Sequence, residues 1–209
     1  MNTTRRTGRS GRITLAATAV AVAALTISGC SSGSNDQLAN QYGKGTTQNY
    51  ISGDGAVTEI SAAKRQEPVD FDVQSDDGKA LSSAALTGTV VVLNFWYAGC
   101  PPCRAEAKHL NTVQQQFQGQ DVQFIGVNVR DQKATAKAFE RNFDVEYPTV
   151  LDADTGSLQL ALSGTIAPNS VPTTIVLDKQ GRVAARILGA VDGPGILTTL
   201  VSDELSGKS

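Results

Sequence analysis

The sequence TVVVLNFWYAGCPPC, residues 89–103, decides the fold of this chain. Its first seven residues form a continuous, β-branched apolar run, which is typical of a strand buried on both faces of a sheet. A helix is predicted to follow over residues 100–117, with apolar residues at helical spacing along one face. The stretch therefore predicts a buried strand that brings two cysteines, Cys100 and Cys103, to the start of a helix.

The start of a helix is a favourable place for a cysteine thiolate. Its unpaired N–H groups and positive potential stabilise negative charge, and in C-x-x-C motifs the cysteine pKa can fall from about 8.5 to roughly 3.5–7.5. Pro101 and Pro102 are tolerated there because the first N–H groups of a helix have no partner within it. We expect Cys100 to be an exposed nucleophile and Cys103 a buried resolving thiol that releases a mixed disulfide.

Three other uses of the cysteine pair are weighed against this redox interpretation. A structural disulfide across two intervening residues closes a loop too small to stabilise the fold much. A structural zinc site needs four ligands, whereas the chain offers Cys100, Cys103 and its single histidine, His109. Haem attachment needs a histidine directly after the second cysteine, where Arg104 stands. The redox interpretation is favoured, with no metal and no cofactor beyond the Cys100–Cys103 disulfide.

Strand-like and helix-like segments alternate along the rest of the domain. Such alternation, followed by a hairpin and a last helix, predicts an α/β sandwich around a mixed sheet. Strands are predicted over residues 69–73, 122–129, 147–151, 173–177 and 182–188, and helices over 133–142, 157–162 and 195–205.

The first thirty residues predict export. Four arginines and no acidic residue accompany an apolar run over residues 13–27, and small residues lead from it to Cys30. This is the pattern of a secretory signal, and the run is shorter than the roughly 20 residues of a membrane-spanning helix. Residues 27–30 (ISGC) resemble the bacterial lipobox, whose cysteine is lipidated and becomes the new N-terminus. A plain signal peptide with an incidental cysteine is the alternative.

Composition divides the chain into three parts. Residues 1–29 are predicted to be a lipoprotein signal peptide, and residues 30–58, rich in Gly, Ser, Asn, Gln and Thr, a flexible tether that spans roughly 30 Å. Residues 59–209 form the predicted folded domain. The expected location is the extracytoplasmic face of the bacterial cell membrane, with lipid anchoring at Cys30.

The charges outside the leader argue against a nucleic-acid partner. Beyond residue 30 the chain carries 14 basic and 20 acidic residues, a formal charge of −6. Phosphate binding requires clustered Lys and Arg, and the body of the chain shows no basic stripe.

Residues 94–106, NFWYAGCPPCRAE, resemble the active-site segment of the extracytoplasmic thioredoxin-like family, which includes the tethered reductases of cytochrome c maturation. Residues 171–173, VPT, resemble the cis-proline loop of that family. The resemblance covers about residues 68–205. It implies a thioredoxin fold, a three-layer sandwich around a mixed central sheet with a helix-containing insertion.

The resemblance also implies roles for individual residues. It assigns a nucleophile, a resolving thiol, a carboxylate behind the pair, and a substrate groove beside it. The nucleophile is Cys100, the resolving thiol is Cys103 and the carboxylate is Glu106. The substrate groove is assigned to Pro172, Val171 and Trp96, and simple core packing is the alternative for Trp96.

Glu106, three residues after the second cysteine, would exchange a proton with Cys103 as the disulfide forms or breaks. A solvated surface glutamate is the alternative for this residue. Asn94 stands where cytoplasmic thioredoxins place a buried acid, so Glu106 would carry that role alone. Gly99 departs from the family, most of whose members have a tryptophan there that helps to form the partner-binding surface.

The function expected from this resemblance is the reduction of disulfides in exported proteins such as apocytochrome c. A membrane thiol–disulfide electron carrier would then re-reduce the pair. Two alternatives stay open. The chain is an oxidant or isomerase of exported proteins in one, and a copper-binding metallochaperone in the other.

Overall fold

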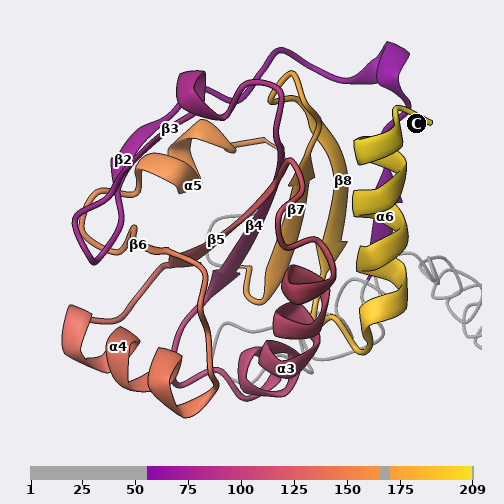
Figure 1. Ribbon diagram of the computed structural model, residues 1–209. Helices are drawn as coiled ribbons and strands as arrows, with labels where there is room; N and C mark the ends of the chain where they lie inside the picture. The colour runs from indigo at the N-terminus through magenta and orange to yellow at the C-terminus, as the bar shows by residue number, and fades with distance from the viewer. Residues whose placement is uncertain (1–55, 165–169, 209) are drawn as a thin grey trace, which may run out of the picture. The chain divides into compact units, whose positions relative to one another are not determined.

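A six-stranded mixed sheet runs through the part of the chain that the computed structural model describes, residues 56–164 and 170–208 (Figure 1). The strand order is β1-β8-β7-β4-β5-β6, and a separate hairpin is formed by β2 and β3. The strands are β1 (Ala56–Glu59), β2 (Asp72–Gln74), β3 (Ala80–Ser82), β4 (Val90–Trp96), β5 (Val122–Asn128), β6 (Thr149–Leu151), β7 (Thr173–Leu177) and β8 (Val183–Leu188).

The strand predicted from the β-branched run is the centre of this sheet. All seven residues of β4 are buried. The strand pairs in parallel with β5 and antiparallel with β7, so neither of its edges reaches solvent. A strand in this position needs apolar side chains on both faces, which explains the absence of polar alternation in its sequence.

Helices cover both faces of the sheet and give it three layers (Figure 1). On one face lie α3, α4 and α6, where α3 packs along α6 and the Phe139 ring of α4 stacks on Trp96. On the other face, α5 and the β2–β3 hairpin cover Leu93 and Phe95 of the central strand. The helical segments are η1 (Ala62–Lys64), η2 (Ala84–Leu86), α3 (Pro101–Gln116), α4 (Lys133–Asn142), α5 (Ser157–Ala161) and α6 (Pro194–Ser206).

This architecture confirms the predicted three-layer α/β sandwich around a mixed sheet. The segment from α4 through β6 adds a helix and a parallel strand beside β5, in the middle of the domain, where the resemblance implies an insertion that contains a helix. Within the described residues no helix has the length and apolar content needed to cross a membrane. The predicted signal peptide, residues 1–29, and the lipidation site Cys30 lie outside the described residues.

The N-terminal boundary of the domain differs from the prediction. The last residues of the predicted tether, 56–58, belong to β1, which pairs antiparallel with β8. This short edge strand has one large apolar residue, Val57. The strand that it pairs with lies near the other end of the chain, so the local sequence gives little indication of β1. The first predicted strand, residues 69–73, is also displaced, because β2 begins only at Asp72.

A buried ionic cluster fastens the N-terminal segment to the C-terminal half of the domain. The Arg65 guanidinium lies 2.9 Å from the Asp178 carboxylate and 2.7 Å from that of Glu204, and its Nε donates to the Ile60 carbonyl at 2.9 Å. The three charged side chains are only 3%, 3% and 8% exposed. Arg65 therefore joins the segment after β1 to the β7–β8 turn and to α6.

Candidate active site

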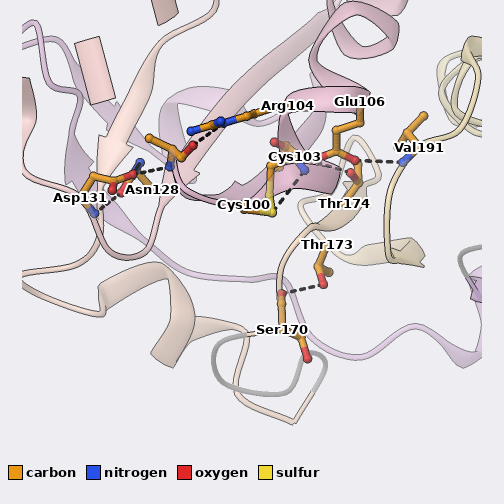
Figure 2. The surroundings of a disulfide bond; sticks show 12 residues. Cys100, Cys103, Arg104, Glu106, Asn128, Asp131, Ser170, Thr173, Thr174 and Val191 are labelled. Carbon is orange, nitrogen blue, oxygen red and sulfur yellow. Dashed lines mark hydrogen bonds between the residues drawn. A yellow bond between two sulfur atoms is a disulfide. The ribbon is translucent and has the colours of Figure 1, made fainter. Parts of the chain in front are cut away.

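The two cysteines lie where β4 gives way to α3, and in this structure they form a disulfide (Figure 2). Their Cα atoms are 5.3 Å apart. Cys100 is the N-cap residue of α3, and its Sγ accepts a hydrogen bond from the backbone N–H of Cys103 at 3.2 Å. Pro101 and Pro102 occupy the first turn of the helix. A negative charge on Cys100 Sγ would therefore meet an N–H donor and the positive end of the helix dipole.

The expectation that Cys100 is exposed is wrong for this oxidised form. The residue is 0% exposed and belongs to an apolar cluster that contains Tyr97 and Val171. The position of Cys100 next to a loop predicted an exposed sulfur. Residues of the loop before β7, which lies far away in sequence, also pack against Cys100 and help to bury it. Cys103 is buried, as predicted.

Glu106 is buried one turn beyond Cys103 on α3, which excludes the alternative of a solvated surface glutamate. It is 1% exposed. Its Oε1 accepts from Asn94 Nδ2 at 2.8 Å, and its Oε2 accepts from the Val191 N–H at 2.9 Å (Figure 2). The Asn94 amide also donates to Thr174 Oγ1 at 3.2 Å. Asn94 thus holds the carboxylate of Glu106 in place.

The surroundings of Glu106 bring its pKa into the physiological range. Burial raises the pKa from 4.5 to about 7, the hydrogen bonds from Val191 and Asn94 oppose that rise, and the nearby negative charge of Asp192 adds to it. Glu106 is also one of the residues that line a pocket of about 690 Å³ between α3, the segment after α4 and the loop before α6. Glu106 can therefore hold or release a proton near neutral pH.

The Val171–Pro172 loop lies beside the cysteine pair. Phe95 of β4 pairs with Thr173 of β7 in antiparallel register, so Pro172 and Val171 run alongside the end of β4 that leads to Cys100. The Val171–Pro172 peptide bond is cis, which agrees with the resemblance of this loop to a cis-proline loop. Thr173 Oγ1 fixes the loop by donating to the Ser170 carbonyl at 2.9 Å (Figure 2).

The predicted substrate groove needs a correction at Trp96. This side chain is 3% exposed, and its ring centroid lies 4.2 Å from that of Phe139 in the core. Trp96 cannot line a surface groove, because its position on β4 turns it toward α4. Val171 and Pro172 are buried as well in this oxidised form.

Two polar residues at the site were missed by sequence reasoning. Asp131 Oδ2 accepts from the Ala98 N–H at 2.6 Å, two residues before Cys100, and Asn128 Nδ2 donates to the same oxygen at 2.8 Å. Asn128 is the last residue of the buried strand β5, which is parallel to β4, and Asp131 lies three residues further along the chain. Parallel strands end at the same edge of a sheet, where sites are commonly built, so the polar residues at the end of this second strand could have indicated the site.

No metal site accompanies the cysteines in the part of the chain that the structure describes. There, no group of three His, Cys, Asp or Glu side chains is arranged to hold an ion. His109 lies on α3 beside the pocket that Glu106 borders, partly exposed.

Comparison with known proteins agrees with this geometry. The thiol-disulfide oxidoreductase ResA of Bacillus subtilis is 28% identical over 131 residues, which are 63% of this chain and 70% of that protein. The crystal structure of a thiol:disulfide interchange protein from Chlorobium tepidum has a TM-score of 0.62 and 28% identity, and covers 69% of this chain and 99% of its own. A secreted thiol-disulfide isomerase from Corynebacterium glutamicum has a TM-score of 0.61 and 31% identity, with 76% and 99% covered.

The family assignment rests on the same region as the site. Residues 65–186, more than half of the chain, match the AhpC/TSA family, and this range contains the cysteine pair, Glu106 and the Val171–Pro172 loop. The similar proteins named above share the thioredoxin-like fold and are named for thiol–disulfide chemistry. The chain therefore belongs to the AhpC/TSA family, among its thioredoxin-like thiol–disulfide oxidoreductases.

Proposed function

We propose that this chain reduces disulfides of exported proteins outside the cytoplasm, through Cys100 and Cys103. One observation carries the proposal. A disulfide caps the N-terminus of α3, and a buried carboxyl with a pKa of about 7 follows one turn behind it. The dithiol can thus form a stabilised thiolate, close a disulfide and exchange a proton at neutral pH.

The reaction is a two-step exchange. In the reduced protein the Cys100 thiolate attacks one sulfur of the substrate disulfide, so a mixed disulfide forms and one substrate thiolate leaves. The Cys103 thiolate then attacks Cys100 Sγ, which closes the Cys100–Cys103 disulfide and releases the second substrate thiol. Two electrons and two protons pass to the substrate, and an external dithiol must return them before the next cycle.

Glu106 would serve the second step as proton acceptor. Cys103 must lose its proton to attack, and in a buried site bulk water cannot take it directly. Glu106 lies one helical turn beyond Cys103. The pocket that Glu106 helps to line would give this proton a route to solvent while a partner protein covers Cys100.

The membrane tether and the substrate are the further parts of this proposal. A lipid at Cys30 and the polar segment after it would hold the domain near the outer surface of the cell membrane, where a membrane dithiol carrier could reduce it. Exported proteins with closely spaced cysteines, such as apocytochrome c, are the substrates we infer. The leader pattern of residues 1–30 and the similarity to secreted thiol–disulfide proteins support this location.

The competing function is net oxidation or isomerisation of exported proteins, which the similarity to a secreted thiol-disulfide isomerase favours. The reduction potential of the purified full chain separates the two. Equilibration with defined thiol buffers, followed by trapping of free thiols, should give a value near or below about −270 mV, the thioredoxin range. A value near −120 mV is that of a strong oxidant and would exclude the reductase.

Glu106→Gln is expected to remove a pH-dependent loss of stability. Folding raises the pKa of Glu106 from 4.5 to about 7, so the folded state binds this proton more tightly than the unfolded state. The wild-type free energy of unfolding, measured against that of the variant, should fall by about 3 kcal/mol between pH 4.5 and 7 and stay level outside that window. Urea unfolding of both oxidised proteins from pH 4 to 8 measures the difference.

A matched control tests whether the pH dependence requires a buried carboxylate. Glu146→Gln removes an exposed carboxylate from the border of the same pocket, and this variant should keep the wild-type pH profile. The amide of Glu106→Gln also alters the hydrogen bond from Val191, but that cost does not depend on pH. A constant difference between wild type and Glu106→Gln across the whole range would contradict the raised pKa.

A further inference from the structure

The loop after β5 reaches across to the segment that carries Cys100. Asp131 places one carboxylate oxygen, Oδ2, 2.6 Å from the backbone nitrogen of Ala98 (Figure 2). The bond joins a charged acceptor to a backbone donor only two residues before Cys100. Hydrogen bonds of this charge-assisted kind are among the stronger ones in proteins.

Asp131 is itself held in place independently of the cysteines. Asn128 Nδ2 donates to Asp131 Oδ2 at 2.8 Å, and Asn128 Oδ1 accepts from the N–H groups of Arg130 and Asp131 at 3.1 and 2.7 Å. Asn128 is fully buried at the end of β5, in register with Trp96 of β4. The position of the Asp131 carboxylate is therefore set by its contacts with the end of β5, independently of its contact with the cysteine loop.

The cysteine loop is also held from its other sides. The Ala98 carbonyl accepts from Arg104 Nε at 2.8 Å, and the Arg130 guanidinium lies 4.2 Å from the centre of the Tyr97 ring. The Cys100 N–H closes a turn onto the Tyr97 carbonyl at 3.1 Å. Side chains thus bind both the N–H and the carbonyl of Ala98. The contact to the carbonyl comes from Arg104 within α3, whereas the contact to the N–H comes from Asp131, outside the β4–α3 segment.

We infer that Asp131 is a positioning residue for Cys100, and that it sets how readily Cys100 and Cys103 close their disulfide. This inference rests on the proposed thiol–disulfide function and names a further residue of that site. Disulfide closure depends on the effective concentration of one thiol at the other, which rises when the segment that carries the first thiol is already fixed. Loss of the Asp131 contact frees the Ala98 peptide and lowers that effective concentration.

Because both donors bond the same oxygen of Asp131, two variants can distinguish the effect of its hydrogen bonds from the effect of its negative charge. In Asp131→Asn, a single amide oxygen can accept from both Ala98 and Asn128, so the geometry is kept and the negative charge is lost. Asp131→Ala loses both. Asp121→Asn serves as a charge control, because this exposed aspartate lies at the opposite end of α3 from Cys100.

The test is the equilibrium of each full-length protein with oxidised and reduced dithiothreitol, read by trapping free thiols. Two electrons and two protons pass between the protein dithiol and the reagent. The equilibrium constant for closing the Cys100–Cys103 disulfide is expected to fall about tenfold in Asp131→Ala relative to Asp131→Asn, which corresponds to about 30 mV. Asp121→Asn should match wild type, and urea unfolding verifies that all four proteins are folded under the conditions used.

Two outcomes would overturn the inference. Equal shifts in Asp131→Asn and Asp131→Ala would mean that the carboxylate acts through its charge, and no shift in either would mean that it does not act on the pair. The measurement needs no protein substrate, so it stands apart from the proposed function. If the wild-type chain failed to reduce any protein disulfide, the proposed function would be rejected, but the dithiothreitol equilibrium would still test the role of Asp131.

Discussion

Cys100→Ser should lose at least about a thousandfold in the rate of protein disulfide reduction, since loss of an attacking nucleophile removes the reaction path itself. The serine hydroxyl can still accept the N–H of Cys103 at the start of α3, as Cys100 Sγ does. It cannot form a disulfide with a substrate. The reduction of insulin by dithiothreitol, with and without the purified full chain, measures this rate. Circular dichroism establishes that the variant is folded.

Cys103→Ser provides the matched comparison, because it keeps the nucleophile and removes the resolving thiol. This variant should form a mixed disulfide with insulin that persists on a non-reducing gel and disappears when dithiothreitol is added. Turnover should be low in both variants, but only Cys103→Ser should accumulate the adduct. If Cys100→Ser retained full activity, or if the adduct formed through Cys103, the roles proposed for the two cysteines would be wrong.

Arg65→Ala should lower the free energy of unfolding by about 3–5 kcal/mol, because it leaves two buried carboxylates without their shared cation. Arg65 bonds Glu204 through both terminal nitrogens, at 2.8 and 2.7 Å, and Asp178 at 2.9 Å. Asp178 keeps a second ionic partner in Arg182, at 2.8 Å. Glu204 is therefore the residue that loses most. Urea unfolding at pH 7, monitored by tryptophan fluorescence, measures the change.

Lys64→Ala is the natural control for Arg65→Ala, because the neighbouring lysine is exposed and its removal should change stability by less than about 0.5 kcal/mol. A second comparison distinguishes charge from geometry. Arg65→Lys keeps the positive charge but cannot bond two carboxylates in the planar, two-pronged manner of a guanidinium, so it should recover only part of the loss. A loss below about 1 kcal/mol in Arg65→Ala would show that the cluster contributes little.

The features predicted correctly from the sequence are those whose signal is local. The β-branched run of β4, the helix that begins after Cys100 and the strand and hairpin around β7 and β8 are each decided by the character of neighbouring residues. Element boundaries agree within about two residues for most of the domain. The alternation of strands and helices, followed by a hairpin, then indicates the mixed sheet.

The features that the sequence did not predict depend on contacts between distant segments. The burial of Cys100 involves the loop before β7, the contact of Asp131 with Ala98 bridges two strand ends, and Arg65 meets carboxylates from the far half of the chain. Glu106 lies between these cases. Its position three residues after Cys103 was informative, but its pKa of about 7 depends on burial, which raises it, and on hydrogen bonds from the distant Val191 and Asn94, which oppose that rise.

The short strands at the two edges of the sheet bear on the risk of aggregation. The sheet ends in β1, four residues long, on one side and in β6, three residues long, on the other. A long open edge offers unpaired N–H and C=O groups to any extended chain and invites aggregation. A thiol–disulfide exchange protein meets unfolded polypeptides as a matter of course, and edges this short give such clients little to pair with.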